Sequence, residues 1–320
     1  MRKATKIWLM TAALLVLIGC ILFVGVMSTL GWDFAKLSTV KYETNTYEIN
    51  EVFSEISINT DTADIIFVLS DDGKCKVECY EEENAKHFVT IEEDILVVKI
   101  NNQKSWYDYI GLHFGSPKIT IYLPKTEYTA LSISESTGDI EIPKDYSFGN
   151  VDISLSTGDV DFFATASRSI KIKTSTGNIR VENTSAGSLD LSASTGKVTV
   201  SGVTCKGTIT LGVSTGKAHL TNVACESVIS IGSTGNITLG NVIATEKISI
   251  ERSTGDVKFI GSDAAEIYVE TDTGDVTGSL LSNKVFITDT DTGRVDVPKT
   301  TTGGRCKIDT DTGDVEITID

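Results

Sequence analysis

The chain has 320 residues, with 44 acidic and 28 basic side chains and a formal net charge of −16. Residues 1–30 hold three of the bases and no acid, so the remainder carries 25 bases (28 − 3) against 44 acids, a charge of −19. This balance argues against nucleic acid as a partner, because binding to phosphates requires a basic surface. It is typical of an exposed, soluble and self-repelling surface.

An uncharged apolar run of 24 residues covers positions 7–30 and is long enough to span a lipid bilayer. Arg2, Lys3 and Lys6 precede the run, and the positive-inside rule therefore places residues 1–6 in the cytoplasm. We predict a single-pass protein of the cell membrane whose bulk is extracytoplasmic.

A second interpretation of the same run is a lipoprotein. Leu17-Ile18-Gly19-Cys20 resembles a lipoprotein cleavage box, which would make Cys20 a lipidated N-terminus. The apolar run continues for ten residues beyond Cys20, and this length favours an uncleaved anchor. A polar juxtamembrane linker is predicted over residues 31–50.

The feature that organises the rest of the chain is a repeated Thr-Gly word. It occurs ten times at spacings of 19 or 20 residues, and Ile, Val or Ala follows two positions after each glycine. So regular a period is typical of a repeat architecture. The glycines are Gly138, Gly158, Gly177, Gly196, Gly216, Gly235, Gly255, Gly274, Gly293 and Gly313.

One repeat, residues 169–187, shows what the word does. Ile170 and Ile172 alternate with lysines before the glycine, and Ile179 and Val181 alternate with charged residues after it. This is the period of half-buried strands, but the inward parity changes at Thr-Gly. The chain must therefore turn a corner there, and glycine tolerates the unusual backbone angle of a corner.

A coil of about twenty residues cannot bury its own apolar face, so coils must stack into a continuous core. We predict an all-β fold, a parallel β-helix or β-solenoid of 19–20 residues per coil, right-handed by the general crossover rule. The regular coils cover residues 131–320. Residues 51–130 are predicted to form irregular N-terminal coils and a cap, with Asp61-Thr62-Ala63 as a degenerate copy of the repeated word.

The most aromatic stretch outside the apolar run contains Trp106, Tyr107, Tyr109 and Phe114. One interpretation is a loop that covers the first coil, because the ends of solenoids need covering. The other is a contact with a membrane surface or a partner.

Two cysteines fall at equivalent repeat positions. Cys205 and Cys225 each lie nine residues after a corner glycine, so they should stack on adjacent coils near the distance range of a disulfide. Two packed thiols are the alternative, since stacked side chains point in the same direction.

Aspartates replace the serine of the word in the last three repeats. Asp272, Asp291 and Asp311 should stack, with Asp275 and Asp314 three residues further on in two of these repeats. A calcium ion would relieve the repulsion between these carboxylates, although a solvated acidic face is the plainer interpretation. The final coil should form the open end of the stack, where its acidic side chains oppose end-to-end pairing.

The sequence offers no catalytic constellation. Its three histidines, His87, His113 and His219, are not placed by sequence near a nucleophile and an acid. Phosphate-loop, zinc and dinucleotide motifs are also missing from the sequence. We therefore expect no enzymatic activity and no cofactor.

The run I-T-I-Y-L-P-K-T-E-Y-T-A-L-S-I-S-E-S-T-G-D-I-E-I at Ile119–Ile142, followed by the STGDV and STGNI repeats, resembles the bacterial putative-adhesin family of β-strand-repeat proteins, a domain of unknown function. The resemblance covers Phe53–Asp320. It implies a right-handed β-helix, an extracytoplasmic location and a link to envelope stress in Gram-positive bacteria. It supplies no catalytic residues.

Three functions are compatible with these observations. The first is a membrane-anchored, non-enzymatic solenoid that acts in surface binding, adhesion or envelope-stress sensing, with an unknown envelope protein or polysaccharide as its partner. The second is a self-assembling envelope scaffold. The third is a carbohydrate-active β-helix enzyme, which would need paired carboxylates at a defined separation.

Overall fold

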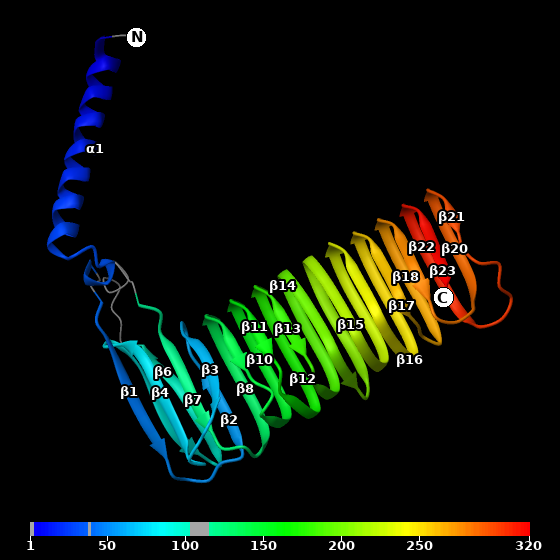
Figure 1. The fold of residues 1–320 in the computed structure, drawn as a ribbon, viewed down its shortest axis with the longest axis horizontal. Coiled ribbons are helices and arrows are strands. Elements are labelled where there is room, and N and C mark those ends of the chain that lie inside the picture. Colours follow the sequence, from blue (N-terminus) through cyan, green and yellow to red (C-terminus); the bar gives the residue numbers. More distant parts are fainter. Residues whose placement is uncertain (1–2, 38–39, 103–114) are drawn as a thin grey trace.

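The structure is a computed structural model that describes residues 3–37, 40–102 and 115–320. Figure 1 shows a long rod of stacked strands with the helix α1 (Lys3–Thr29) at one end. The part of α1 from Thr5 to Thr29 is long and apolar enough to cross a membrane, a property that a signal sequence shares. The short 3-10 helix η1 (Phe34–Leu37) follows it.

In the described residues the rod is built from 23 strands in one continuous sheet, and the prediction of a β-solenoid behind an apolar helix is confirmed. The strands are β1 (Tyr42–Ile49), β2 (Glu55–Asn59), β3 (Asp64–Leu69), β4 (Cys75–Glu82), β5 (Ala85–Glu92), β6 (Ile95–Asn102), β7 (Lys118–Leu123), β8 (Glu127–Thr137), β9 (Ile140–Ile142), β10 (Ser147–Thr157), β11 (Val160–Phe162), β12 (Thr165–Thr176), β13 (Ile179–Glu182), β14 (Ser185–Cys205), β15 (Thr208–Thr234), β16 (Ile237–Thr254), β17 (Val257–Ser262), β18 (Glu266–Thr273), β19 (Val276–Leu280), β20 (Lys284–Thr292), β21 (Val295–Asp296), β22 (Gly304–Thr312) and β23 (Val315–Ile319).

Neighbouring coils pair in parallel with equivalent residues opposite each other. In β10 and β12, Ile153 lies opposite Ile172 and Thr157 lies opposite Thr176. The predicted inward positions before and after the corner are buried, as Ile172 and Ile179 show. One apolar core therefore runs along the inside of the rod, because every coil contributes side chains at the same positions.

The corner glycines are required by the approach of adjacent coils. Nine of the ten have φ between 125° and 159°, a region closed to other residues, and Gly293 is the exception. A Cβ atom on Gly196 would overlap the carbonyl oxygen of Gly177 on the neighbouring coil. Equivalent overlaps occur at the other corner glycines, so the backbones approach closely at a single edge of the rod.

At the N-terminal end the coils do not follow the order of the sequence. The strand β2 lies between β6 and β8, and β3 lies between β7 and β9. The first coil is therefore inserted between segments that come later in the chain. Its corner, the degenerate word ending at Ala63, occupies the place of a corner glycine beside Gly138.

Antiparallel strands close this end of the rod. The strand β4 pairs antiparallel with β1 on one side and with β7 on the other, and β5 pairs antiparallel with β6. The strand β1 comes from the segment predicted to be a juxtamembrane linker. These strands cover the first coils, and β4 and β5 lie within residues 51–130, where irregular coils and a cap were predicted.

At the C-terminal end the expected order is wrong. The final coil in the sequence, β22 and β23, lies between β18–β19 and β20–β21 instead of at the open end. The outermost coil is β20–β21, visible beside β22 in Figure 1. All these coils carry the same repeated word, so each can pair with any other, and the sequence period does not reveal their order.

A buried guanidinium lies inside the regular part of the rod. Arg252 occupies an inward position and is 3% exposed, and its Nη2 donates to Ser230 Oγ at 2.7 Å. Gly232 lies opposite Arg252 on the neighbouring coil, where any side chain would collide with the guanidinium. The serine and the glycine thus replace the apolar residues of other coils and leave room for the arginine.

The corner geometry predicts the effect of adding a single methyl group. We expect Gly196→Ala to lower the stability of the rod by more than about 2 kcal/mol, because it adds a strained φ and a clash with the Gly177 carbonyl. Gly240→Ala is the matched control, since its nearest neighbouring atom would lie at 3.8 Å. Thermal unfolding followed by circular dichroism compares the two, and equal midpoints would contradict the explanation.

Candidate functional site

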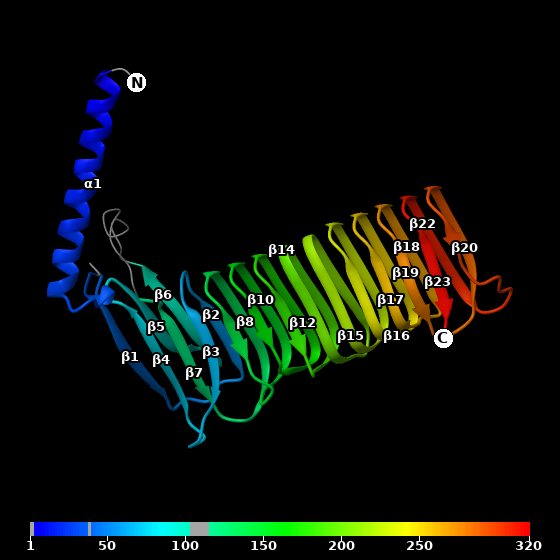
Figure 2. The same cartoon turned by 45° about the horizontal axis from the view of Figure 1, so that its top comes forward.

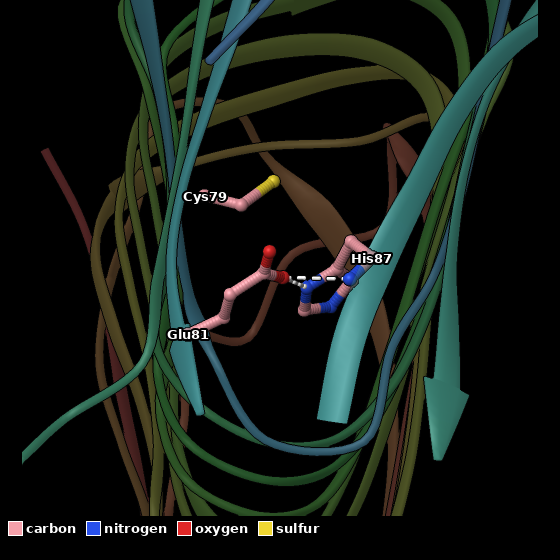
Figure 3. A group of neighbouring side chains, drawn as sticks. All are labelled: Cys79, Glu81 and His87. Carbon is pink, nitrogen blue, oxygen red and sulfur yellow. Dashed lines mark hydrogen bonds and ion pairs between the residues drawn. The ribbon is translucent and has the colours of Figure 1, made fainter. Parts of the chain in front are cut away.

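A buried polar cluster lies under the N-terminal cap, and Figure 3 shows three of its members. The alternation of β4 directs Cys79 and Glu81 into the rod, and the alternation of β5 directs His87 toward them. His87 Nδ1 lies 2.6 Å from Glu81 Oε2, and His87 Nε2 lies 2.8 Å from the hydroxyl of Thr60, just after β2. The sequence alone placed no histidine near a nucleophile and an acid, but the fold brings Thr60 and Glu81 to His87.

Further contacts fix the orientation of the cluster. Asn45 Nδ2 donates to Glu81 Oε1 at 2.7 Å, and the backbone N–H of His87 donates to Glu81 Oε2 at 2.6 Å. Tyr47 donates its hydroxyl proton to the carbonyl of His87 at 2.8 Å. The glutamate and the imidazole are therefore held from three strands, β1, β4 and β5.

The order hydroxyl, imidazole, carboxylate is that of a hydrolytic triad, but the surroundings differ from those of an active site. Thr60 is 5% exposed, His87 3% and Glu81 1%. The adjacent hollow, lined in part by Asp61 and Thr62, has a volume of about 30 Å³. That space holds one water molecule and no substrate, so the cluster suits the binding of a small ion better than acyl transfer.

Cys79 completes a group with the chemistry of metal ligands. One ligand atom each from Cys79, Glu81 and His87 lies within 4.8 Å of the others. Burial, and secondarily the charge of Glu81, raises the pKa of the Cys79 thiol to about 12. The sequence analysis missed this group, because its members lie on two strands and match no metal motif.

A second buried carboxyl, Glu135, lies one coil further along the rod. Its Oε1 accepts the backbone N–H of Ala63 at 3.0 Å, and its Oε2 has no hydrogen-bond partner. Burial raises the pKa of Glu135 to about 8, and the charges of Asp64 and Asp139 add to the shift. The side chain is therefore mostly neutral at pH 7 in the folded protein.

The raised pKa of Glu135 predicts a pH-dependent stability. The unfolded chain releases this proton near pH 4.5 and the folded chain near pH 8, so stability falls as pH rises through this window, by roughly 5 kcal/mol in total. We expect Glu135→Gln to remove most of this slope, and Glu141→Gln, at an exposed outward position, to leave it unchanged. Unfolding midpoints measured from pH 4 to pH 9 test this prediction. If stability depends on pH as steeply in Glu135→Gln as in the unmodified chain, the prediction is wrong.

The residue after the corner glycine forms a ladder along the rod. Its carboxylate or amide oxygen accepts the backbone N–H of the equivalent residue on the next coil, which explains the Asp and Asn of the repeated word. The ladder follows the spatial order of the coils, since Asp275 bonds to Asp314 and Asp314 bonds to Arg294. The bonds are Asp64 to Asp139 (3.1 Å), Asp139 to Asp159 (2.8 Å), Asp159 to Asn178 (2.7 Å), Asn178 to Lys197 (3.0 Å), Asn236 to Asp256 (3.1 Å), Asp256 to Asp275 (3.2 Å), Asp275 to Asp314 (2.8 Å) and Asp314 to Arg294 (2.8 Å).

The ladder predicts that the acceptor atom matters more than the charge. We expect Asp159→Ala to cost about 1 kcal/mol, because the N–H of Asn178 loses its partner, and Asp159→Asn to cost much less. Asp152→Ala, which removes only an exposed ion pair with Lys171, serves as the control and should change stability by less than about 0.5 kcal/mol. Equal losses in the alanine and asparagine variants at position 159 would assign the effect to charge.

The acidic columns predicted near the C-terminal end are present in a different order. Thr312 pairs with both Thr273 and Thr292, so Asp311 lies between Asp272 and Asp291. These three aspartates are exposed. Asp275 and Asp314 belong to the ladder, and Arg294 pairs with Asp314 at 3.0 Å. Backbone N–H groups thus contact the carboxylates of Asp275 and Asp314, and Arg294 also contacts that of Asp314. Calcium binding by these two residues together with Asp272, Asp291 and Asp311 remains a prediction.

The last two predicted groups are the cysteine pair and the aromatic segment. Cys205 and Cys225 are buried free cysteines on adjacent coils. Burial raises the pKa of Cys225 to about 12. Trp106, Tyr107, Tyr109 and Phe114 lie outside the described residues.

The end of the rod opposite α1 is an open edge, which we call the distal edge and define as β20 and β21. In the described part of the chain, β20 pairs only with β22, and β21 pairs only with β23. Val295 is 43% exposed at a position that is buried in every complete coil. Two hollows of about 620 and 420 Å³ lie beside β21. Figure 2 shows this edge at the far end of the stack from α1.

The Toastrack DUF4097 family matches residues 53–223 and 206–320, and the chain belongs to this family. No functionally curated protein matches the chain.

Several solved structures are similar to this chain at low identity. A putative adhesin from Bacteroides fragilis is 18% identical with a TM-score of 0.43, over 87% of this chain and 97% of its own. A putative adhesin from Parabacteroides distasonis is 12% identical with a TM-score of 0.49, over 76% of this chain and 98% of its own. A putative lipid binding protein from the same organism is 17% identical with a TM-score of 0.46, over 75% and 95%.

Proposed function

We propose that this chain is a membrane-anchored, non-enzymatic rod that binds a partner in the cell envelope through its distal edge. The bases before α1 and the acidic remainder support an N-terminus in the cytoplasm and a rod outside. Adhesion to a surface and sensing of envelope stress are both uses of such a binding rod.

The observation that carries the proposal is the unpaired edge of β20. An unpaired strand offers a row of backbone N–H and C=O groups, which an extended polypeptide can pair with. Val295 and the partly buried Phe286 add apolar surface at the same edge. These features favour a polypeptide partner over a polysaccharide, because backbone pairing requires another backbone.

The charge of the distal edge favours a different molecule over a second copy. Asp289, Asp291 and Asp296 are exposed on the outermost coil. Two copies that meet edge to edge would bring these like charges together, which opposes self-assembly. A partner strand with basic side chains would meet no such repulsion.

The non-enzymatic part of the proposal is supported by the surroundings of His87 and His219, the two histidines among the described residues. His87 lies beside a hollow that admits one water, and His219 is on the outer surface with no acid bonded to its ring in the described residues. Burial, together with Lys197 and Lys217, lowers the pKa of His219. Neither imidazole combines an accessible nucleophile with a cleft.

The binding proposal is tested with variants of one edge residue. We expect Val295→Lys to abolish capture of envelope proteins by the full-length chain in lipid nanodiscs, because a lysine at an edge blocks strand addition. Ile231→Lys, at a mid-rod position that is 52% exposed, is the control and should capture the same proteins as the unmodified chain.

Three other results would each change the proposal. Unchanged capture by Val295→Lys would remove the distal edge as the binding surface. Loss of capture on deletion of residues 106–114 alone would assign binding to the aromatic segment. Light scattering that rises with the concentration of the chain, and is abolished by Val295→Lys, would favour the scaffold.

A further inference from the structure

The buried cluster under the N-terminal cap has the donor atoms of a transition-metal site, and its role is separate from the distal edge. We propose that Cys79, Glu81 and His87 bind one zinc ion, which ties β4 to β5 at the capped end of the rod. The three ligand atoms already lie within 4.8 Å of one another (Figure 3).

The histidine is oriented for binding through Nδ1. Its Nε2 lies 2.8 Å from Thr60 Oγ1, and its Nδ1 points at the carboxylate of Glu81. Histidines that bind metals hold their second ring nitrogen in a hydrogen bond, which fixes the tautomer. In the zinc-bound state Nε2–H donates to Thr60, and Nδ1 presents its lone pair to the ion.

The glutamate is held in a similar way. Asn45 Nδ2 donates to Oε1 at 2.7 Å, and this leaves Oε2 on the side of His87. A ligating carboxylate with its other oxygen hydrogen-bonded is the usual arrangement around bound metals. His87 is therefore held through Nε2 and Glu81 through Oε1, while Nδ1 and Oε2 face each other.

Binding of the ion requires the Cys79 thiol to lose its proton. In the metal-free state the thiol is protonated, because burial raises its pKa to about 12. On binding, this proton leaves to solvent, and the sulfur and His87 Nδ1 bond to the metal. Zinc thus neutralises the thiolate and the carboxylate inside the rod.

The donor set selects the class of metal. One sulfur, one nitrogen and one oxygen suit zinc, whereas calcium and magnesium take oxygen ligands. The hollow of about 30 Å³ beside Glu81 and His87 has room for one water, which supplies the fourth ligand of a tetrahedral site. Bond lengths of about 2.0–2.3 Å require the Cys79 side chain to move inward by a small amount.

The test measures zinc on the full-length protein in detergent micelles. After loading and exhaustive dialysis, we expect one zinc per chain by mass spectrometry, and at least one proton released per zinc in a weakly buffered titration. Cys79→Ser and Glu81→Gln should each weaken zinc binding at least tenfold. Cys75→Ser is the matched control, because this buried cysteine lies on the same strand outside the cluster and should bind zinc as the unmodified chain does.

Cobalt provides a readout that identifies the sulfur ligand. We expect the cobalt-loaded protein to show a thiolate-to-cobalt charge-transfer band that Cys75→Ser retains and Cys79→Ser loses. Circular dichroism of each variant serves as the control for folding. If Cys79→Ser does not fold, the Glu81→Gln variant provides the test instead. This variant can still hydrogen-bond to His87, and we expect it to shift the charge-transfer band. Absence of the band in the unmodified chain would overturn the proposal, as would zinc binding by the Cys79 and Glu81 variants that equals that of the unmodified chain.

Discussion

The structure depends on one close approach, the contact between backbones at the Thr-Gly corner of each coil. There the carbonyl oxygen of one corner glycine occupies the space that a Cβ would need on the next, and φ between 125° and 159° closes the position to other residues. The register of the whole rod follows from this contact, because a slip of one residue would bring a side chain against a carbonyl. The Asp and Asn side chains of the ladder strengthen the same edge by bonding to the next coil's N–H groups.

A stack that is regular along its length has two ends with unsatisfied edges, and the chain treats them differently. At the N-terminal end, antiparallel pairing of β1, β4 and β5 covers the first coils and encloses the polar cluster around His87. At the other end β20 and β21 remain unpaired on their outer side among the described residues. The covered end lies beside the apolar helix and the open end lies far from it (Figure 1).

The interior tolerates polar groups where neighbouring coils make room for them. Arg252 is accommodated because Ser230 and Gly232 replace apolar residues on the adjacent coil, and Glu135 is mostly neutral at pH 7 because burial raises its pKa to about 8. Both side chains occupy an inward position that elsewhere holds residues such as Leu155 or Val213. A repeat therefore dictates the direction of a side chain but not its chemistry, and the exceptions are the places to look for function.

The sequence alone determined the apolar helix, the 19–20-residue coil, the corner at each Thr-Gly and the inward faces of the strands. These are local properties, since alternation, apolar length and the need for glycine can be read from neighbouring residues. Only the tertiary structure decided the order of the coils at both ends, because coils with the same word pair equally well in more than one order. It also brought together Cys79 and Glu81 of β4, His87 of β5 and Thr60 just after β2, a contact between segments that no spacing in the sequence records.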